Sequence, residues 1–440
     1  MVPEKHTHTT TKKQQPIGMG NTASVGRLEK RARSVTHTER GVTVHIKSPA
    51  PEVSKKERSV SCSDLQRLSQ GSGKAVPSSN KYDLDSEVKP IPVRRRSFTK
   101  KNLIIPNLQL SPKLPKWKKL VPKEEGPGDI TGHGAVVMGS RLYVFGGSQG
   151  LEGDGDNVMA RLWHYDFRTR RWTRVESGEE SGGPRARAAL AMCEGLDPDT
   201  FIVSGGVGKG PMGMPLVMGD VYQFSTLTQL WCRLVDAINC PQNFCRFYGQ
   251  SMCRYGEEHL YFFGGSDGGR LTNDVYRYSI FTTRVEKLWC GGTPPSPRYK
   301  HQAFIYEHHL YVVGGGGRTP AAGDIDVFRL DLAERVWEEV PQAGGGVPAA
   351  RNGHACALDA ARGRAYLFGG YDHALARRPS LHYFDLAREE WRRVARGGEP
   401  PAPRAGHTLH VVAGGDRLVL LGGSDGRRRF GDLFTCALDP

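Results

Sequence analysis

Two adjacent glycines follow a short apolar run six times in this 440-residue chain. The first glycines of successive pairs stand 50 to 59 residues apart. The pairs are Gly146-Gly147, Gly205-Gly206, Gly264-Gly265, Gly314-Gly315, Gly369-Gly370 and Gly422-Gly423. A repeat period of about 50 residues is typical of propellers and other arrays, in which each repeat buries its apolar face against its neighbours. The period therefore predicts six repeats packed around a common axis.

Each repeat carries signals for four strands. β-branched and aromatic runs such as Leu142–Phe145 precede the glycine pairs and are typical of strands. A second run with an aromatic residue, such as Val275-Tyr276, follows each pair, and another strand, often opened by Gly-His, precedes it. A tryptophan is expected on the fourth strand, where its large apolar area can fill the contact between neighbouring repeats. These tryptophans are Trp117, Trp172, Trp231, Trp289, Trp337 and Trp391, and Trp163 alone lies outside the pattern.

The first and last repeats predict how the ring closes. The sixth repeat ends with its third strand, between Gly431 and Leu438. A strand-like segment that contains Trp117, Pro115–Val121, instead precedes the first repeat. Pairing of this segment with the last strand would remove the exposed sheet edges that invite aggregation. We therefore expect residues 115–440 to form an all-β, six-bladed propeller closed by an N-terminal strand.

The glycine pair, the spaced aromatic residue and the spaced tryptophan together resemble the kelch family of β-propellers over residues 115–440. Within that family, Arg246–Ser251 and Arg298–His301, with the glycine runs that follow them, are most similar to receptors for C-terminal degrons. The resemblance implies a protein-protein interaction adaptor that presents a partner to a cullin-2 ubiquitin ligase through elongin. No helical pattern follows the sixth repeat, where such receptors have ligase-docking helices, and this favours a general interaction adaptor.

Residues 1–110 differ from the rest of the chain in composition. Residues 1–120 hold 25 basic and 9 acidic residues, whereas residues 121–440 hold 36 and 37. Residues 1–110 are rich in Ser, Thr, Lys and Arg and poor in aromatic residues, so they cannot bury enough apolar surface to offset their ordering entropy. We expect a disordered basic tail with no specific affinity for nucleic acid. Its basic motifs predict phosphorylation at Ser59, Ser61 and Ser97, and it could join a membrane only if translation from Met19 exposed Gly20 to myristoylation.

The apolar segments and the cysteines indicate where in the cell the protein is expected. The chain has no run of 18 apolar residues and no secretory apolar segment, so we expect a cytoplasmic protein, with the nucleus as an alternative. Its nine cysteines are odd in number and include no Cys-x-x-Cys. This pattern argues against a disulfide framework and against a zinc site, so we expect reduced thiols and no cofactor.

Arginines recur where the chain enters the first strand of a repeat, on the face that also carries the loops after the glycine pairs. Arginine holds a carboxylate bidentately and keeps its charge when desolvated, so a ring of arginines would suit a peptide C-terminus or an acidic segment. The degron-receptor resemblance implies this role for Arg246 and Arg298 in particular. The predicted ligand-binding residues are Arg246, Tyr248, Ser266, Arg298, Tyr299, Arg351, Tyr371 and Arg404, with the run Arg427–Arg429 nearby.

Other interpretations of the same residues stay open. An arginine before Gly-His can simply cap a strand or pair with a neighbouring carboxylate. Members of the kelch family also include actin-binding scaffolds, which would not require a terminal carboxylate. Glu125, Asp129 and His133 have the spacing of the iron site in kelch-type plant specifier proteins, but this pattern occurs once, in a glycine-rich loop. No nucleophile–base pair stands out, so we expect a protein that is not an enzyme and binds no metal.

Overall fold

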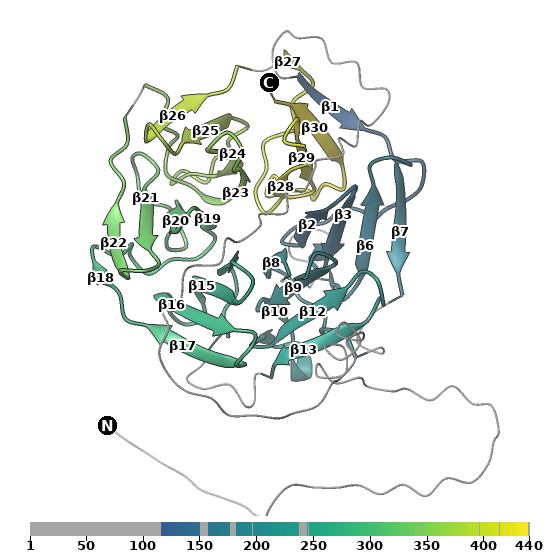
Figure 1. The fold of residues 1–440 in the computed structure, drawn as a ribbon. Helices are drawn as coiled ribbons and strands as arrows, with labels where there is room; N and C mark the ends of the chain where they lie inside the picture. The colour runs from purple at the N-terminus through teal and green to yellow at the C-terminus, as the bar shows by residue number, and fades with distance from the viewer. Residues whose placement is uncertain are drawn as a thin grey trace, which may run out of the picture. The chain divides into compact units, whose positions relative to one another are not determined.

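The structure, a computed structural model, describes residues 116–438 apart from 150–156, 177–181, 196, 237–243, 245, 344, 396 and 413. The described residues form six antiparallel blades of four strands arranged in a ring (Figure 1), and a channel runs through the centre of the ring. This confirms the predicted all-β, six-bladed propeller. No helix among the described residues is long and apolar enough to cross a membrane. The expected disordered tail, the phosphorylation sites Ser59, Ser61 and Ser97, and Gly20 lie outside the described residues.

The strands of each blade are named from the channel outward. Blade 1 has β2 (Gly134–Met138), β3 (Arg141–Phe145), β6 (Leu162–Asp166) and β7 (Arg171–Val175), and blade 2 has β8 (Ala191–Glu194), β9 (Thr200–Ser204), β12 (Val221–Ser225) and β13 (Trp231–Val235). Blade 3 has β14 (Ser251–Tyr255), β15 (His259–Ser266), β16 (Leu271–Ser279) and β17 (Arg284–Leu288), and blade 4 has β19 (Gln302–Tyr306), β20 (His309–Val313), β21 (Val327–Asp331) and β22 (Val336–Glu339).

Blades 5 and 6 follow the same plan. Blade 5 has β23 (Asn352–Asp359), β24 (Arg364–Tyr371), β25 (Leu381–Asp385) and β26 (Glu390–Arg393), and blade 6 has β28 (Thr408–Val411), β29 (Arg417–Leu421), β30 (Leu433–Ala437) and β1 (Lys116–Leu120). Shorter elements in the connections are β4 (Ser148–Gln149), β5 (Asn157–Val158), β10 (Val207–Lys209), η2 (Pro211–Gly213), β11 (Pro215–Val217), β18 (Gly291–Gly292) and β27 (Gly397–Gly398).

The N-terminal strand closes the ring, as predicted. β1 pairs antiparallel with β30, with Trp117 opposite Cys436 and Leu120 opposite Leu433. The side chain of Trp117 is 2% exposed and packs edge-on against Phe368 of blade 5, with ring centroids 5.4 Å apart. The segment that completes blade 6 therefore also seals the contact between the last two blades.

Tryptophans on the outer strands fill the contacts between blades, with one exception. Trp231 packs against Phe145 of blade 1, and Trp337 packs against Phe263 of blade 3, each with ring centroids 5.3 Å apart. The assignment of Trp289 to this set was wrong, because Trp289 follows the end of β17 and is 81% exposed. Val285, opposite Tyr278, occupies the position that tryptophan holds elsewhere.

A histidine from the next blade packs against the first glycine of several glycine pairs. A Cβ atom on Gly264 would lie 2.8 Å from Cε1 of His301, and one on Gly314 would lie 2.9 Å from Cε1 of His354. Gly264 also has φ +65, a conformation that glycine adopts without steric cost. The glycine pairs are therefore needed both for the turn that ends the second strand and for the contact with the next blade.

A closed belt of six backbone hydrogen bonds encircles the channel just before the innermost strands. Each blade contributes one residue, whose N–H donates to the carbonyl oxygen of the equivalent residue in the preceding blade over 2.7 to 3.0 Å. All six residues have a positive φ, between 53 and 67. They are Gly132, Ala189, Gly249, Lys300, Gly353 and Gly406. The belt fixes the spacing of the inner strands and so the width of the channel.

Candidate binding site at the mouth of the channel

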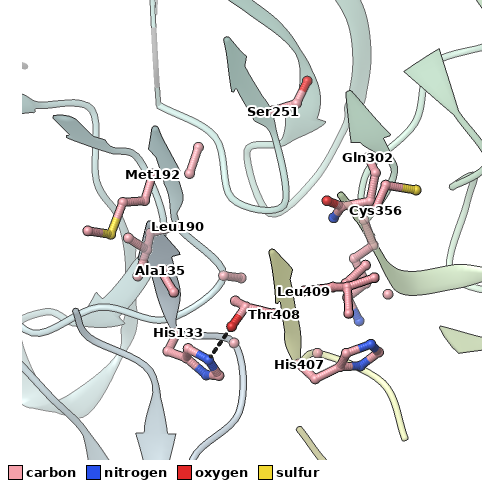
Figure 2. Close-up of a pocket in the computed structure, with 18 of the residues that line it drawn as sticks. His133, Ala135, Leu190, Met192, Ser251, Gln302, Cys356, His407, Thr408 and Leu409 are labelled. Carbon is pink, nitrogen blue, oxygen red and sulfur yellow. Dashed lines mark hydrogen bonds between the residues drawn. The ribbon is translucent and has the colours of Figure 1, made fainter. Parts of the chain in front are cut away.

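The central channel is a cavity of about 900 Å³ lined by the six innermost strands and by the loops at one end (Figure 2). We call that end, on the loop side of the belt, the mouth. Tyr248, Lys300, Tyr371, Arg377 and Arg429 line the cavity there. The strands supply small and apolar residues farther along, among them Ala191, Leu409 and Ile305. Three of the four lysine and arginine side chains that line the described cavity therefore lie at the mouth, and the fourth, Arg254, lies on β14.

Lys300 lies against two aromatic rings on one side of the mouth. Its ammonium nitrogen lies 5.1 Å from the ring centre of Tyr299 and 5.6 Å from that of Tyr371, and it donates a hydrogen bond of 3.4 Å to the Tyr371 hydroxyl. The ring of Tyr248 packs edge-on against Tyr299, with centroids 5.9 Å apart. Burial raises the pKa of Tyr299, so its hydroxyl stays protonated and can donate to a ligand. Two tyrosines thus contact the cation, and a third packs against one of them.

Two arginines complete the mouth. The guanidinium of Arg377 lies 5.6 Å from the ring centre of Tyr371 and rests against Gly426, in a loop of blade 6. Its Nη1 donates to the carbonyl oxygen of Leu375 over 3.0 Å, while its buried Nε has no hydrogen-bond partner among the described residues. Arg429, which is 6% exposed, lines the cavity from blade 6.

Among the described residues, the lining of the mouth holds more positive than negative charge. Of the described residues that line the channel, Glu194 is the only acidic one, and it ends β8 at the opposite end from the mouth. Lys300, Arg377 and Arg429 therefore bring three positive charges to one opening. Such an opening attracts anionic groups and discriminates against cationic ones.

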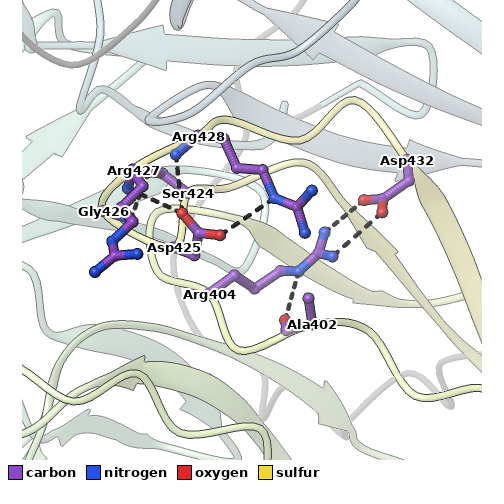
Figure 3. A network of polar contacts seen from close by, with 8 residues as sticks. All are labelled: Ala402, Arg404, Ser424, Asp425, Gly426, Arg427, Arg428 and Asp432. Carbon is purple, nitrogen blue, oxygen red and sulfur yellow. Dashed lines mark hydrogen bonds and ion pairs between the residues drawn. The ribbon is translucent and has the colours of Figure 1, made fainter.

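The arginines predicted to bind the ligand lie inside the blades instead. Arg298 is 3% exposed, and its Nη1 and Nη2 each donate to the carboxylate of Asp326 over 2.9 Å. Nη1 also donates to the carbonyl oxygen of Gly314 over 2.8 Å. Arg404 repeats this arrangement with Asp432 and Gly422, with Nη1 2.5 Å from the carboxylate (Figure 3). These guanidinium groups have their donors occupied within their own blades, so they cap strands and do not line the mouth.

Arg351 differs from Arg187, Arg298 and Arg404 because no carboxylate of the described residues forms an ion pair with it. Its Nη1 donates to the carbonyl oxygen of Gly369 over 3.0 Å and its Nε to that of Ala349 over 2.8 Å. Burial and the nearby charge of Arg378 lower the pKa of Arg351 to about 10. Ser380, immediately before β25, stands where Asp326 and Asp432 stand before their strands. In the described part of the chain, carbonyl groups hold Arg351, which, like Arg298, does not line the mouth.

Arg246 does not occupy the position equivalent to Arg298. Tyr248 bridges to Ser266 as Tyr299 bridges to Gly316, so Phe247 is the residue of blade 3 that corresponds to Arg298. Arg246 lies one residue earlier and is exposed. Arg246 and Arg298, which the sequence analysis expected to play the same role, therefore occupy positions that differ by one residue. Ser266 is 5% exposed, and its hydroxyl accepts a hydrogen bond from Gly268 N–H within the loop.

The structure thus brings Tyr248, Tyr299 and Tyr371 of the predicted set together and separates them from the predicted arginines. The cation among them, Lys300, was missed from the sequence. A signal existed, because Lys300 stands before a histidine where Gly132, Gly353 and Gly406 stand in other repeats. It holds φ +53, an unfavourable conformation for a side chain with a Cβ atom. A lysine in a position that favours glycine indicates a use for its charge.

The histidines near the belt serve the packing of the blades. His133 shares a hydrogen bond of 3.0 Å through Nε2 with the hydroxyl of Thr408 (Figure 2). Burial lowers the pKa of His133, His301 and His354 to about 3, so these imidazoles are neutral. Glu125 and Asp129 are exposed whereas His133 is buried. No group of three or more His, Cys, Asp or Glu side chains in the described part of the chain is placed to hold a metal ion.

Comparison with known proteins places the whole propeller in one family. The family model of the KLHDC2/KLHL20/DRC7 Kelch-repeats domain matches residues 107–247, 239–344 and 303–439. Kelch domain-containing protein 10 of Xenopus tropicalis is 28% identical over 302 residues, which cover 66% of this chain and 70% of that protein. The human protein of that name is 28% identical over 323 residues, covering 70% of this chain and 66% of that protein. Acyl-CoA-binding domain-containing protein 5 of Arabidopsis thaliana is 30% identical over 307 residues, 67% of this chain and 44% of that protein. The chain belongs to the kelch-repeat family of β-propellers.

Proposed function

We propose that this kelch propeller is a non-catalytic interaction adaptor that binds an anionic segment of a partner protein at its mouth. The observation that carries the proposal is the position of Lys300, against the rings of Tyr299 and Tyr371 and in a belt where four of the other five residues are glycine. A peptide C-terminus offers a carboxylate at the end of a narrow chain, which suits an opening of this kind. The ammonium of Lys300 and the guanidinium of Arg377 would hold it by charge-assisted hydrogen bonds.

The family resemblance supports one particular form of this adaptor, a receptor for C-terminal degrons in a ubiquitin ligase. Such a receptor needs a site that prefers a free terminal carboxylate. The cations of the mouth would supply this preference without Arg246 and Arg298, the arginines that the family resemblance implied. Recovery of elongin and cullin-2 with the full-length chain would support the ligase role. Recovery of other proteins alone would leave a general adaptor.

The test compares peptides that differ only at the C-terminus. A peptide library with free C-termini is screened for binding by fluorescence polarisation, and the strongest binder is then amidated. We expect amidation, Lys300→Gly and Arg377→Ala each to weaken binding at least tenfold, because each removes one partner of a charge-assisted contact. Arg171→Ala, in the outer strand β7 where the side chain is 57% exposed, is the matched control and should leave affinity unchanged. Affinity that is indifferent to Lys300→Gly and Arg377→Ala would refute the proposed site.

A further inference from the structure

Three blades hold a guanidinium group in the same way, between a carboxylate and an aromatic ring. The carboxylate belongs to an aspartate just before the third strand, and the ring belongs to the second residue after that aspartate. The Cζ atom of the arginine lies 5.3 to 5.9 Å from the centre of this ring. The sets are Arg187 with Asp220 and Tyr222, Arg298 with Asp326 and Phe328, and Arg404 with Asp432 and Phe434.

Blade 3 keeps two of these three groups. Asp274 and Tyr276 occupy the positions of the aspartate and the aromatic ring, but Phe247 stands where the arginine stands elsewhere. Asp274, Tyr276 and Phe247 line a cavity of about 310 Å³. The side chain of Asp274 is 30% exposed, so a group from another molecule can reach its carboxylate. Phe244 packs against the ring of Tyr276, with centroids 5.4 Å apart, and so fixes the ring in place.

Lys287 now supplies the positive charge at this carboxylate. Its ammonium nitrogen lies 2.9 Å from Asp274 Oδ1 and 5.2 Å from the ring centre of Trp289, which is 81% exposed. Lys287 therefore has a second partner to which it can turn. An ammonium is a point charge that cannot form the planar, bidentate contact that a guanidinium makes with a carboxylate. Asp267 lines the same cavity, where it pairs with the exposed Arg270.

We propose that the cavity of blade 3 is a binding site for the guanidinium group of an arginine side chain presented by a partner protein. Asp274 would accept its hydrogen bonds and the ring of Tyr276 would face it, as in blades 2, 4 and 6. Lys287 would then turn toward Trp289. The cavity of blade 3 would bind a cation, whereas the mouth would bind an anion. The cavity is therefore a second contact point, and it does not depend on the function proposed for the mouth.

The test uses N-acetyl-arginine amide as the probe, titrated into the full chain and followed by ligand-observed NMR. N-acetyl-lysine amide is the matched probe, with the same charge but without the planar group. We expect the arginine derivative to bind at least tenfold more tightly than the lysine derivative. Asp274→Asn should weaken arginine binding at least tenfold, while Lys300→Gly at the mouth should leave it unchanged.

A second variant keeps the proposal falsifiable if Asp274→Asn does not fold. Phe247→Arg places an internal guanidinium in the position that Arg298 occupies in blade 4, so it should exclude the probe while the chain still melts cooperatively. Equal binding of the two probes would overturn the proposal. So would undiminished arginine binding in whichever of the two variants is folded.

Discussion

Two sets of cations in this propeller differ in their surroundings, one inside the blades and one at the mouth. Arg298 and Arg404 are buried and bidentate with aspartates of their own blades. Lys300 and Arg377 face the channel, where their neighbours among the described residues are aromatic rings and not carboxylates. The difference teaches that the role of a cation follows from its partners. A buried cation whose donors are occupied stabilises the fold, whereas one among neutral rings is available to an anionic ligand.

The largest effect expected from this comparison concerns the buried set. Arg404→Ala should lower the free energy of unfolding by about 3–5 kcal/mol, because it leaves Asp432 mostly buried without its partner. Arg428→Ala is the control in the same blade, since Arg428 is 70% exposed and pairs with Asp425 over 3.3 Å (Figure 3). It should cost less than about 1 kcal/mol. Urea unfolding of both variants measures the difference, and equal losses would refute the distinction.

The next effect is the loss of stability at acidic pH that the buried histidines next to the belt should cause. His133, His301 and His354 have a pKa of about 3 in the folded chain, against about 6.5 when unfolded. The folded state is therefore fully favoured above pH 6.5 and loses stability as the pH falls toward 3, because only the unfolded chain takes up these protons. Each histidine should cost about 1.4 kcal/mol at pH 5.5.

The measurement is the melting temperature between pH 7.5 and 5.5. His301→Gln is the variant that tests this, because Gln250 stands in the equivalent position of blade 3 and shows that glutamine fits there. This variant should show a shallower loss of stability with acid. An unchanged pH dependence would mean that His301 is not one of the groups that titrate on unfolding.

A smaller effect should follow from giving Arg351 a carboxylate partner like those of Arg298 and Arg404. Ser380→Asp places a carboxylate where Asp326 and Asp432 stand in blades 4 and 6. We expect a gain of about 1 kcal/mol in the free energy of unfolding, close to the net value of one added polar contact. Denaturant unfolding checks the gain, and the double variant Ser380→Asp with Arg351→Ala should abolish it. A gain that persists without Arg351 would have another cause.

The smallest effect on stability is expected at the mouth. Lys300→Gly relieves a positive φ but gives the unfolded chain more freedom, so the free energy of unfolding should stay equal or rise by at most about 1 kcal/mol. Thermal and urea unfolding provide the measurement. A clear loss of stability would show that Lys300 serves the fold, as Arg298 does, and would weaken the case for a ligand there.

The sequence predicted the repeat, the number of blades and the closing strand, because each rests on local features with a regular period. Prediction from the sequence failed where a shift of a few residues along the chain changes the environment of a side chain. Trp289 lies four residues beyond Val285, which takes the place of tryptophan in blade 3, and Arg246 lies one residue before Phe247. The tyrosines of the mouth were among the predicted residues but its cations were not, because the pairing of Arg298 with Asp326 and the positive φ of Lys300 are visible only in the structure.

Arg298 and Lys300 are separated by a single residue and test the central claim most directly. The measurement is the affinity of the Arg298→Ala and Lys300→Gly variants for the strongest C-terminal peptide, at a temperature where both are folded. We predict that Lys300→Gly weakens binding at least tenfold, and that Arg298→Ala changes it less than threefold while unfolding more readily. Binding that is lost with Arg298→Ala and kept with Lys300→Gly would contradict the account.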